Sequence, residues 1–332
     1  MSRFKANHLA IASIISISSI VLAACGSASS TTSSSKPTST SGSSSTATTV
    51  VNVAFDPNAT ALPAWVAQDK GIFAKNHLDV KFTKIQNLST LPGALGNTFN
   101  IVLSTPTELL SAAKSGLPVV EVSGSSIGTP TNPTGEVMVS PTSGIHSLAD
   151  LEGKSIGTLT LNGTLTYALE YDLLIHKLNP KGIKLVTMAA PTMADNLKAG
   201  NVPAVITVPP FITALKKAGN IPLLNPYDAV GSKLASIFWI GSSSWAKQHP
   251  QAIKEWVTSL DQAQTYIAQN NTAARAVLVK YTGLPEAVIK NFALPIYNTS
   301  LRPNDLARWA TVMQKLGIIA NPPSISSLMV NG

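Results

Sequence analysis

Short runs of apolar and β-branched residues alternate with amphipathic helical patterns along most of the chain, from Val50 onward. The helical stretches carry apolar residues three and four positions apart, whereas the runs between them are too short for helices. An alternation of this kind is typical of parallel strands covered by helices on both faces of a sheet. The pattern therefore predicts an α/β fold with parallel-rich mixed sheets flanked by helices.

The expected elements can be placed by residue range. Strands are expected over 50–55, 80–85, 101–103, 119–123, 155–160, 183–188, 202–207 and 237–240. Helices are expected over 64–70, 108–115, 165–173, 192–199, 211–218, 253–267 and 306–316. Glycine marks several of the helix ends, as at Gly71, Gly116 and Gly200, because it adopts the left-handed conformation that often follows the last helical turn.

The order of these elements divides the body of the chain in two. A second unit begins after Gly135, and the run at 237–240 leads the chain back into the first unit. We therefore expect a discontinuous first domain of residues 50–137 plus 238–332 and a second domain of residues 138–237. Two strands crossing near 137 and 238 would form a hinge beside a ligand cleft, because closure of hinged domains around a solute is a common conformational switch.

The first fifty residues have a different pattern. Arg3 and Lys5 precede an apolar run over 9–24, and Cys25 is followed by a tract that consists almost entirely of Ser and Thr. The run is shorter than the roughly 20 residues of a membrane-spanning helix, and its flanks are those of a secretory signal peptide. We interpret 1–24 as a signal peptide and 25–49 as a flexible tether; an uncleaved N-terminal anchor is the alternative.

The sequence Leu-Ala-Ala-Cys at 22–25 resembles the lipobox of bacterial lipoproteins. This resemblance implies that Cys25 is acylated, with palmitate as the expected fatty acid, and becomes the new N-terminus. It also implies an extracytoplasmic protein that is anchored to the cell membrane through its lipid. The sequence has a single cysteine, Cys25. Once it is acylated, no thiol remains for a disulfide, for catalysis or for a metal.

Composition and charge exclude several classes of protein. Charged residues make up 12% of the chain and apolar residues 44%, which is enough for a sizeable core. The formal net charge is +8, but the Lys and Arg residues are scattered, whereas nucleic-acid binding requires them on one face. The 5 His residues lie far apart and lack the spacings of zinc ligands. We expect a monomer with no nucleic-acid partner, no metal and no cofactor.

Four segments resemble the type 2 periplasmic solute-binding proteins of ABC importers, in their nitrate, sulfonate, taurine and thiamine-pyrimidine branch. They are 65–80, which begins Trp-Val-Ala-Gln-Asp-Lys-Gly-Ile-Phe-Ala-Lys, then 104–120, 147–157 and 245–255. Two features depart from the family pattern: Pro203 stands where the family usually has Asp, and the loop 208–210 lacks its Trp. The resemblance implies the two-domain fold of these proteins, with its crossover strands as the hinge.

Two helix starts are the main candidates for binding a ligand. Free N–H groups and hydroxyls at a helix N-terminus favour a polar or anionic oxygen, although ordinary helix capping uses the same residues. The resemblance places both starts at the cleft. Their residues are Ser104, Thr105 and Thr107, and Asn162, Gly163, Thr164 and Thr166. Further candidates from nearby loops and strand ends are Leu62, Pro63, Trp65, Ser123, Ser125 and Pro209.

These observations predict a lipid-anchored receptor that captures a small polar organic or anionic solute and delivers it to an ABC permease. The solute would be of the sulfonate, nitrate or pyrimidine class, and no catalysis is expected. The Gly-x-Ser-x-Gly match at 124–128 is followed by prolines, which exclude the helix that a nucleophile elbow needs. Two alternatives remain: a ligand sensor for a membrane kinase, and an enzyme like the pyrimidine synthase of the same superfamily.

Overall fold

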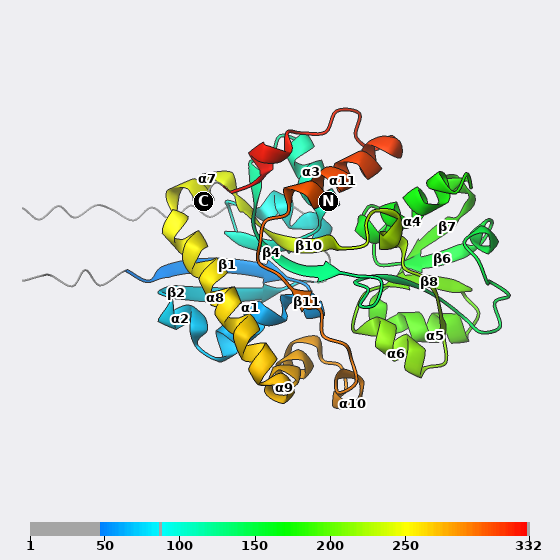
Figure 1. The fold of residues 1–332 in the computed structure, drawn as a ribbon, viewed down its shortest axis with the longest axis horizontal. Coiled ribbons are helices and arrows are strands. Elements are labelled where there is room, and N and C mark those ends of the chain that lie inside the picture. The colour runs from blue at the N-terminus through cyan, green and yellow to red at the C-terminus, as the bar shows by residue number, and fades with distance from the viewer. Residues whose placement is uncertain (1–46, 86–87, 331–332) are drawn as a thin grey trace, which may run out of the picture. The chain divides into compact units, whose positions relative to one another are not determined.

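The computed structural model describes residues 47–85 and 88–330, and the strands of these residues form two mixed sheets (Figure 1). The six-stranded sheet has the order β11-β4-β10-β3-β1-β2, with β1 (Thr49–Phe55), β2 (Leu78–Lys84), β3 (Ile101–Ser104), β4 (Val119–Gly128), β10 (Leu234–Ser242) and β11 (Ile296–Tyr297). The five-stranded sheet has the order β7-β6-β8-β5-β9, with β5 (Glu136–Val139), β6 (Ser155–Thr158), β7 (Lys184–Thr187), β8 (Ala204–Thr207) and β9 (Ile221–Leu224).

Each sheet combines parallel and antiparallel pairs. Strand β1 runs parallel to β2 and β3, and β6 runs parallel to β7 and β8. The antiparallel pairs are formed by the strands that follow each passage from one sheet to the other. Strand β10 pairs with β3 and β4, and β5 pairs with β8 and β9. The predicted α/β class with mixed sheets is confirmed.

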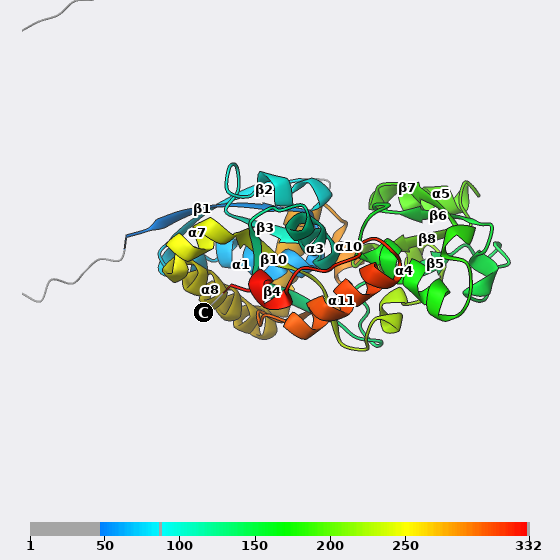
Figure 2. The same ribbon diagram turned by 90° about the horizontal axis from the view of Figure 1, so that it is seen from above.

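Helices cover the faces of both sheets (Figures 1 and 2). They are α1 (Leu62–Asp69), α2 (Ile72–Lys75), α3 (Pro106–Lys114), α4 (Thr164–Ile175), α5 (Met193–Lys198), α6 (Phe211–Lys217), α7 (Ser243–Gln248), α8 (Pro250–Gln269), α9 (Asn271–Thr282), α10 (Glu286–Ile289) and α11 (Pro303–Lys315). Single 3₁₀ turns lie at Ala59–Ala61, Leu88–Thr90, Pro92–Ala94, Ala149–Leu151, Pro180–Gly182, Ala190–Thr192, Pro226–Ala229 and Ile325–Leu328. Helix α11, which follows β11 of the six-stranded sheet, packs against α4 beside the other sheet (Figure 2).

The chain passes between the two sheets twice. It leaves the six-stranded sheet after Gly128 and enters the other sheet at Glu136, then leaves that sheet after Leu224 and returns at Leu234. A hydrogen bond of 2.9 Å between the buried hydroxyls of Thr134 and Ser236 joins the first passage to β10, near the end of the second passage. The expected domains, 50–137 plus 238–332 and 138–237, stay a prediction.

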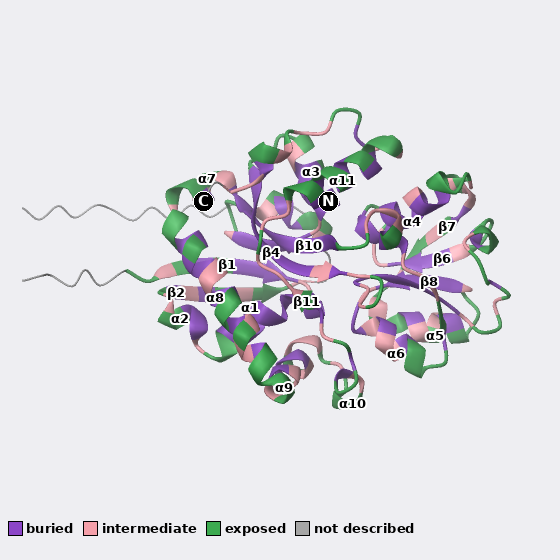
Figure 3. Cartoon of the chain, viewed as in Figure 1, coloured by how far each residue is buried: buried purple, intermediate pink, exposed green. Residues whose placement is uncertain are grey.

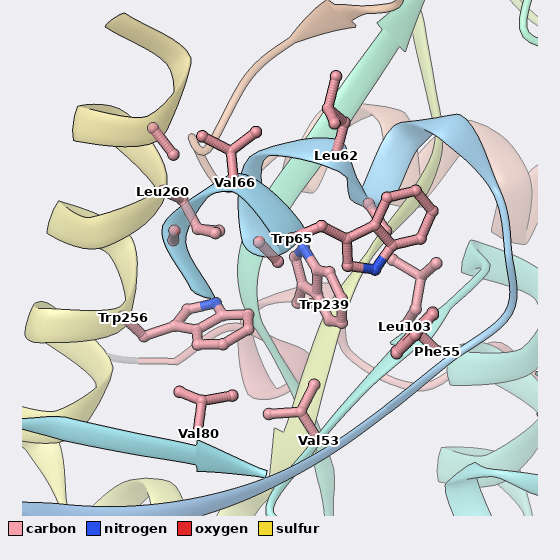
Figure 4. Close-up of a cluster of buried hydrophobic side chains, with 14 of the residues drawn as sticks. Val53, Phe55, Leu62, Trp65, Val66, Val80, Leu103, Trp239, Trp256 and Leu260 are labelled. Carbon is pink, nitrogen blue, oxygen red and sulfur yellow. The ribbon is translucent and has the colours of Figure 1, made fainter. Parts of the chain in front are cut away.

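The core of the six-stranded side is built around buried tryptophans (Figure 4). Trp256 of α8 stacks on Phe73, with ring centroids 5.1 Å apart, and meets the ring of Trp239 edge-on. Its Nε1 donates a hydrogen bond of 3.1 Å to Ser123 Oγ in β4. The apolar stripe of α8 therefore packs this helix against α1 and the sheet. The inner strands of that sheet are largely buried (Figure 3).

The predicted signal peptide, the acylated Cys25 and most of the predicted tether lie outside the described residues. Within 47–85 and 88–330, the helices include none with the length and apolar character that crossing a membrane requires.

Candidate ligand-binding site

A cavity of about 590 Å³ is lined by residues from both sides of the molecule. Its walls come from the loop after β1, the start of α3, the start of α4, the segment after β7 and the two passages between the sheets. Cavities of a few hundred Å³ are typical of sites that enclose a small organic molecule. The wall is predominantly apolar, with Leu159, Leu165, Met188, Phe211 and Ile237 among its residues.

The loop after β1 brings two polar side chains to this cavity. Strand β1 buries Val51, Val53 and Phe55, and Asp56 follows at its carboxyl end. In open α/β sheets, ligands bind at the carboxyl ends of parallel strands, and Asp56 lies at such an end. Asp56 Oδ1 and Thr60 Oγ1 are buried and find no hydrogen-bond partner within 47–85 and 88–330, and both residues line the cavity.

The start of α3 contributes Thr105 and Glu108. The two form a capping box: Thr105 Oγ1 accepts from the Glu108 backbone N–H at 3.4 Å, and Glu108 Oε2 accepts from the Thr105 backbone N–H at 3.0 Å. Ser104 Oγ also donates to Glu108 Oε2, at 3.2 Å. This helix start is therefore capped by its own side chains, while Thr105 and Glu108 still line the cavity.

The start of α4 forms the opposite wall. Gly163 is the N-cap residue and makes no side-chain cap, so the first N–H groups of the helix are not used by a capping side chain. Tyr227 donates from its hydroxyl to Thr164 Oγ1 at 3.2 Å, and this contact ties α4 to the second passage between the sheets. Gly163, Thr164 and Tyr227 all line the cavity.

Of the residues predicted to bind a ligand, Thr105, Gly163 and Thr164 line the cavity. The others have structural positions away from its wall. Buried in α1 are Leu62, Pro63 and Trp65, and buried at helix starts are Ser104, Thr107 and Thr166. Ser123 hydrogen-bonds to Trp256, and Ser125 donates to the Thr60 carbonyl. Pro209 is buried beside the lining residue Val208. Asn162 instead lines a second hollow, beside Leu161 and Leu316.

Several residues that line the cavity were not predicted from the sequence. Asp56 had a usable signal, because an acidic residue directly after a buried parallel strand is a common ligand position. Tyr227, Ser236 and Met188 had none, since they come from segments far apart in the chain that only the fold brings together.

The charges of the wall are mainly acidic. Its titratable residues are Asp56, Lys84, Glu108 and Tyr227. Burial raises the pKa of Asp56 to about 7, and the charge of Glu108 adds to the rise. Burial also raises the pKa of Glu108, against the hydrogen bonds from Thr105 and Ser104. The pKa of Tyr227 rises to about 12 through burial, so this phenol stays neutral.

Lys84 is the cationic residue of the wall, and its Nζ already donates to the Tyr281 carbonyl at 3.3 Å. His, Cys, Asp and Glu side chains nowhere gather in threes suited to a metal ion across the described part of the chain.

Comparison with known proteins gives consistent matches. A family model described as NMT1/THI5 like matches residues 58–274. The chain is 29% identical over 270 residues to a Haemophilus influenzae protein named "Putative thiamine biosynthesis protein", covering 76% of this chain and 82% of that one. It is 25% identical over 264 residues to the taurine-binding periplasmic protein of Escherichia coli, covering 76% and 79%.

Solved structures with the same fold include both binding proteins and an enzyme. The periplasmic aliphatic sulphonate binding protein SsuA of Escherichia coli superposes with a TM-score of 0.71 at 15% identity, covering 85% of this chain and 97% of that one. The periplasmic nitrate-binding protein NrtA of Synechocystis gives 0.70 at 14% identity, covering 84% of each chain. The desulfurization enzyme DSZB gives 0.60 at 16% identity, covering 84% and 96%.

Proposed function

The chain belongs to the NMT1/THI5-like family, and from this premise we propose that it is the solute-binding component of an ABC importer. One observation carries the proposal: a cavity of about 590 Å³ is walled by elements of both sheets, which the chain joins by two passages. The proposed solute is a small polar organic molecule, within the set of sulfonate, nitrate and pyrimidine-like compounds that the resemblance implies. The sulphonate-, taurine- and nitrate-binding relatives support this assignment.

The proposed mechanism is closure around the solute without chemistry. The solute docks on the wall formed by the loop after β1 and the start of α3, and the part that holds the five-stranded sheet rotates about 129–135 and 225–233. A ligand stabilises the closed form only through its higher affinity for that form. Lys217 at the end of α6 donates to the Ala287 carbonyl of α10, and this contact joins the two parts when they are closed. The permease then recognises the closed form.

The location is part of the same proposal. An acyl chain on Cys25 would anchor the protein to the outer face of the cell membrane, and the Ser/Thr-rich tract would hold the folded body away from the lipid. A single acyl chain binds a membrane only marginally, so stable anchoring requires a second signal, such as a second acyl chain.

We also propose that the protein is not an enzyme. Among the described residues that line the cavity there is neither His, the most frequent general base, nor Cys, a frequent nucleophile. DSZB demonstrates that an enzyme can have this fold, so fold similarity alone does not decide between binding and catalysis. Recovery of the bound solute unchanged after prolonged incubation distinguishes the two.

Gly163 provides a specific test of the cavity as the binding site. A Cβ atom at this position would lie 2.5 Å from Thr160 Cγ2, and both residues line the cavity. We expect Gly163→Ala to displace Thr160 into the site and to weaken binding of the captured solute about tenfold, or about 1.4 kcal/mol. The solute is identified by mass spectrometry of molecules that co-purify with the protein, and its affinity is then measured by titration calorimetry.

The matched control is Gly163→Ala combined with Thr160→Ser. Serine removes the methyl group that causes the clash and keeps the hydroxyl that accepts from the Asn162 backbone N–H at 3.4 Å. The double variant should recover most of the lost affinity. Wild-type affinity in Gly163→Ala would remove the start of α4 from the site.

A further inference from the structure

The two carboxyl groups of the cavity lie in one wall. Asp56 comes from the loop after β1 and Glu108 from the first turn of α3, and the two are near enough for their charges to interact. Glu108 Oε2 is occupied by the Thr105 backbone N–H and by Ser104 Oγ. By contrast, Asp56 Oδ1 is enclosed and accepts no hydrogen bond.

A neighbouring hydroxyl is also without a partner. Thr60 is only 2% exposed and lines the cavity, yet its Oγ1 makes no hydrogen bond in the described residues. Buried polar atoms are nearly always paired, because an unpaired one loses its hydrogen bonds to water without replacement. Asp56 and Thr60 thus form a pair of unused acceptors in the same wall, and a solute with hydrogen-bond donors would satisfy both.

The charge of the wall indicates which donors these are. Two acidic residues line the cavity, the half-buried Asp56 and the buried Glu108, and Lys84 lies exposed in its wall, where its Nζ donates to the Tyr281 carbonyl. A buried carboxylate is costly unless an opposite charge or a set of donors compensates it. An anion placed here would lie against two acids, whereas a cation would let both ionise.

Resting on the proposed function, we propose that the solute carries a positively charged nitrogen whose N–H groups bind Asp56 and Glu108. The apolar walls formed by Leu88, Met188, Val208 and Phe211 enclose the compact body of the solute. This charge requirement narrows the solutes proposed above, because it leaves out nitrate and the alkanesulfonates and retains compounds with a basic nitrogen.

Three probes of nearly the same size isolate the charge. Benzamidine is a cation, benzamide is neutral, and benzenesulfonate is an anion. Calorimetric titration of the full mature chain should give benzamidine an affinity at least about tenfold above that of benzamide, which corresponds to about 1.4 kcal/mol. Benzenesulfonate should bind more weakly than both. Equal or tighter binding of benzenesulfonate, or binding of none of the three, overturns the inference.

Variants separate the acid pair from general electrostatics. Asp56→Asn keeps the shape of the side chain and should reduce the preference for benzamidine over benzamide to within about threefold; Glu108→Gln should reduce it less, because its Oε2 is already occupied. Asp79→Asn is the matched control, since it removes the same charge from an exposed carboxylate that pairs with Lys81. If Asp56→Asn and Asp79→Asn have the same small effect, the cation does not bind at Asp56.

The pH dependence gives a second readout. The titratable groups of the wall are Asp56, Glu108, Lys84 and Tyr227. Of these, Asp56 has a raised pKa of about 7, which lies between pH 5.5 and pH 8.5. Benzamidine affinity should therefore increase more than tenfold between pH 5.5 and 8.5, and this increase should shrink in Asp56→Asn. A flat profile contradicts the inference. If the protein binds an anion from the wider panel but not benzamidine, the solute-binding function stands and only the charge assignment fails.

Discussion

Replacing Glu121 by glutamine should raise the free energy of unfolding by about 3–5 kcal/mol at pH 8 and should change it little at pH 5. Glu121 lies in β4 and is 0% exposed, and within the described residues neither of its carboxylate oxygens makes a hydrogen bond of normal geometry. Burial raises its pKa from 4.5 to about 8; the nearby Arg302 opposes this rise and Asp305 adds to it. Glutamine is neutral at every pH and close in shape to the protonated acid.

The direction follows from proton linkage. The folded state holds the Glu121 proton more tightly than the unfolded state, so the stabilising effect of the neutral carboxyl is present below pH 4.5. It is lost progressively as the pH rises through about 8. Asp56 has a raised pKa as well and acts in the same direction.

Urea unfolding at pH 5 and pH 8 measures this effect. The wild type should lose stability over the interval, and Glu121→Gln should lose much less. Glu286→Gln, at an exposed carboxylate of α10, is the control and should stay within about 0.5 kcal/mol of the wild type at both pH values. Parallel pH profiles for the wild type and Glu121→Gln would show that Glu121 is ionised in the folded protein.

Replacing Trp256 by alanine should lower the free energy of unfolding by about 3–5 kcal/mol, the usual range for removing a large aromatic side chain from a core. Trp256 is 0% exposed and stacks on Phe73. It also packs edge-on against Trp239 (Figure 4). The substitution opens a cavity where α8 meets α1 and the sheet, and rigid strands on one side prevent collapse around it.

Two further substitutions divide this loss into packing and hydrogen bonding. Ser123→Ala leaves the buried Trp256 Nε1–H unpaired and should cost about 1–3 kcal/mol. Trp256→Phe removes the same hydrogen bond together with its donor and retains part of the ring packing, so its cost should fall below that of Trp256→Ala. Urea unfolding gives all three values. A loss in Trp256→Ala no greater than in Ser123→Ala would contradict the packing account.

The fold was largely predictable because its main signals are local. The apolar run of β1, the glycine after α1 and the stripe of α8 each depend on neighbours in sequence. Some short strands were not predicted from the sequence, and for β9 the physical reason is clear. Strand β9 contains Pro222, which normally argues against a strand, but β9 lies at a sheet edge, where proline is tolerated.

The cavity was less predictable than the fold. Helix-start chemistry identified Thr105, Gly163 and Thr164, because hydroxyls and glycine at a helix start are visible in the sequence. Trp65 has the residue type expected of a stacking partner, yet it is enclosed in the core, where its ring stacks on Tyr281. Whether such a residue faces a ligand or the core depends on which side of its helix meets the sheet, and tertiary packing decides that.

Thermal unfolding in the presence of candidate solutes tests the central claim most directly, namely that this chain binds a small molecule between its two sheets. The panel consists of taurine, alkanesulfonates, nitrate, hydroxymethyl- and formylamino-pyrimidines, riboflavin and benzamidine. A solute at about 100 times its Kd should stabilise the folded protein by about 2.7 kcal/mol, which raises Tm by about 5 °C for a chain of this size. A saturable rise with one class, reduced to about half in Gly163→Ala at the same solute concentration, is the predicted result. An unchanged Tm with every solute in the panel would contradict the proposed function.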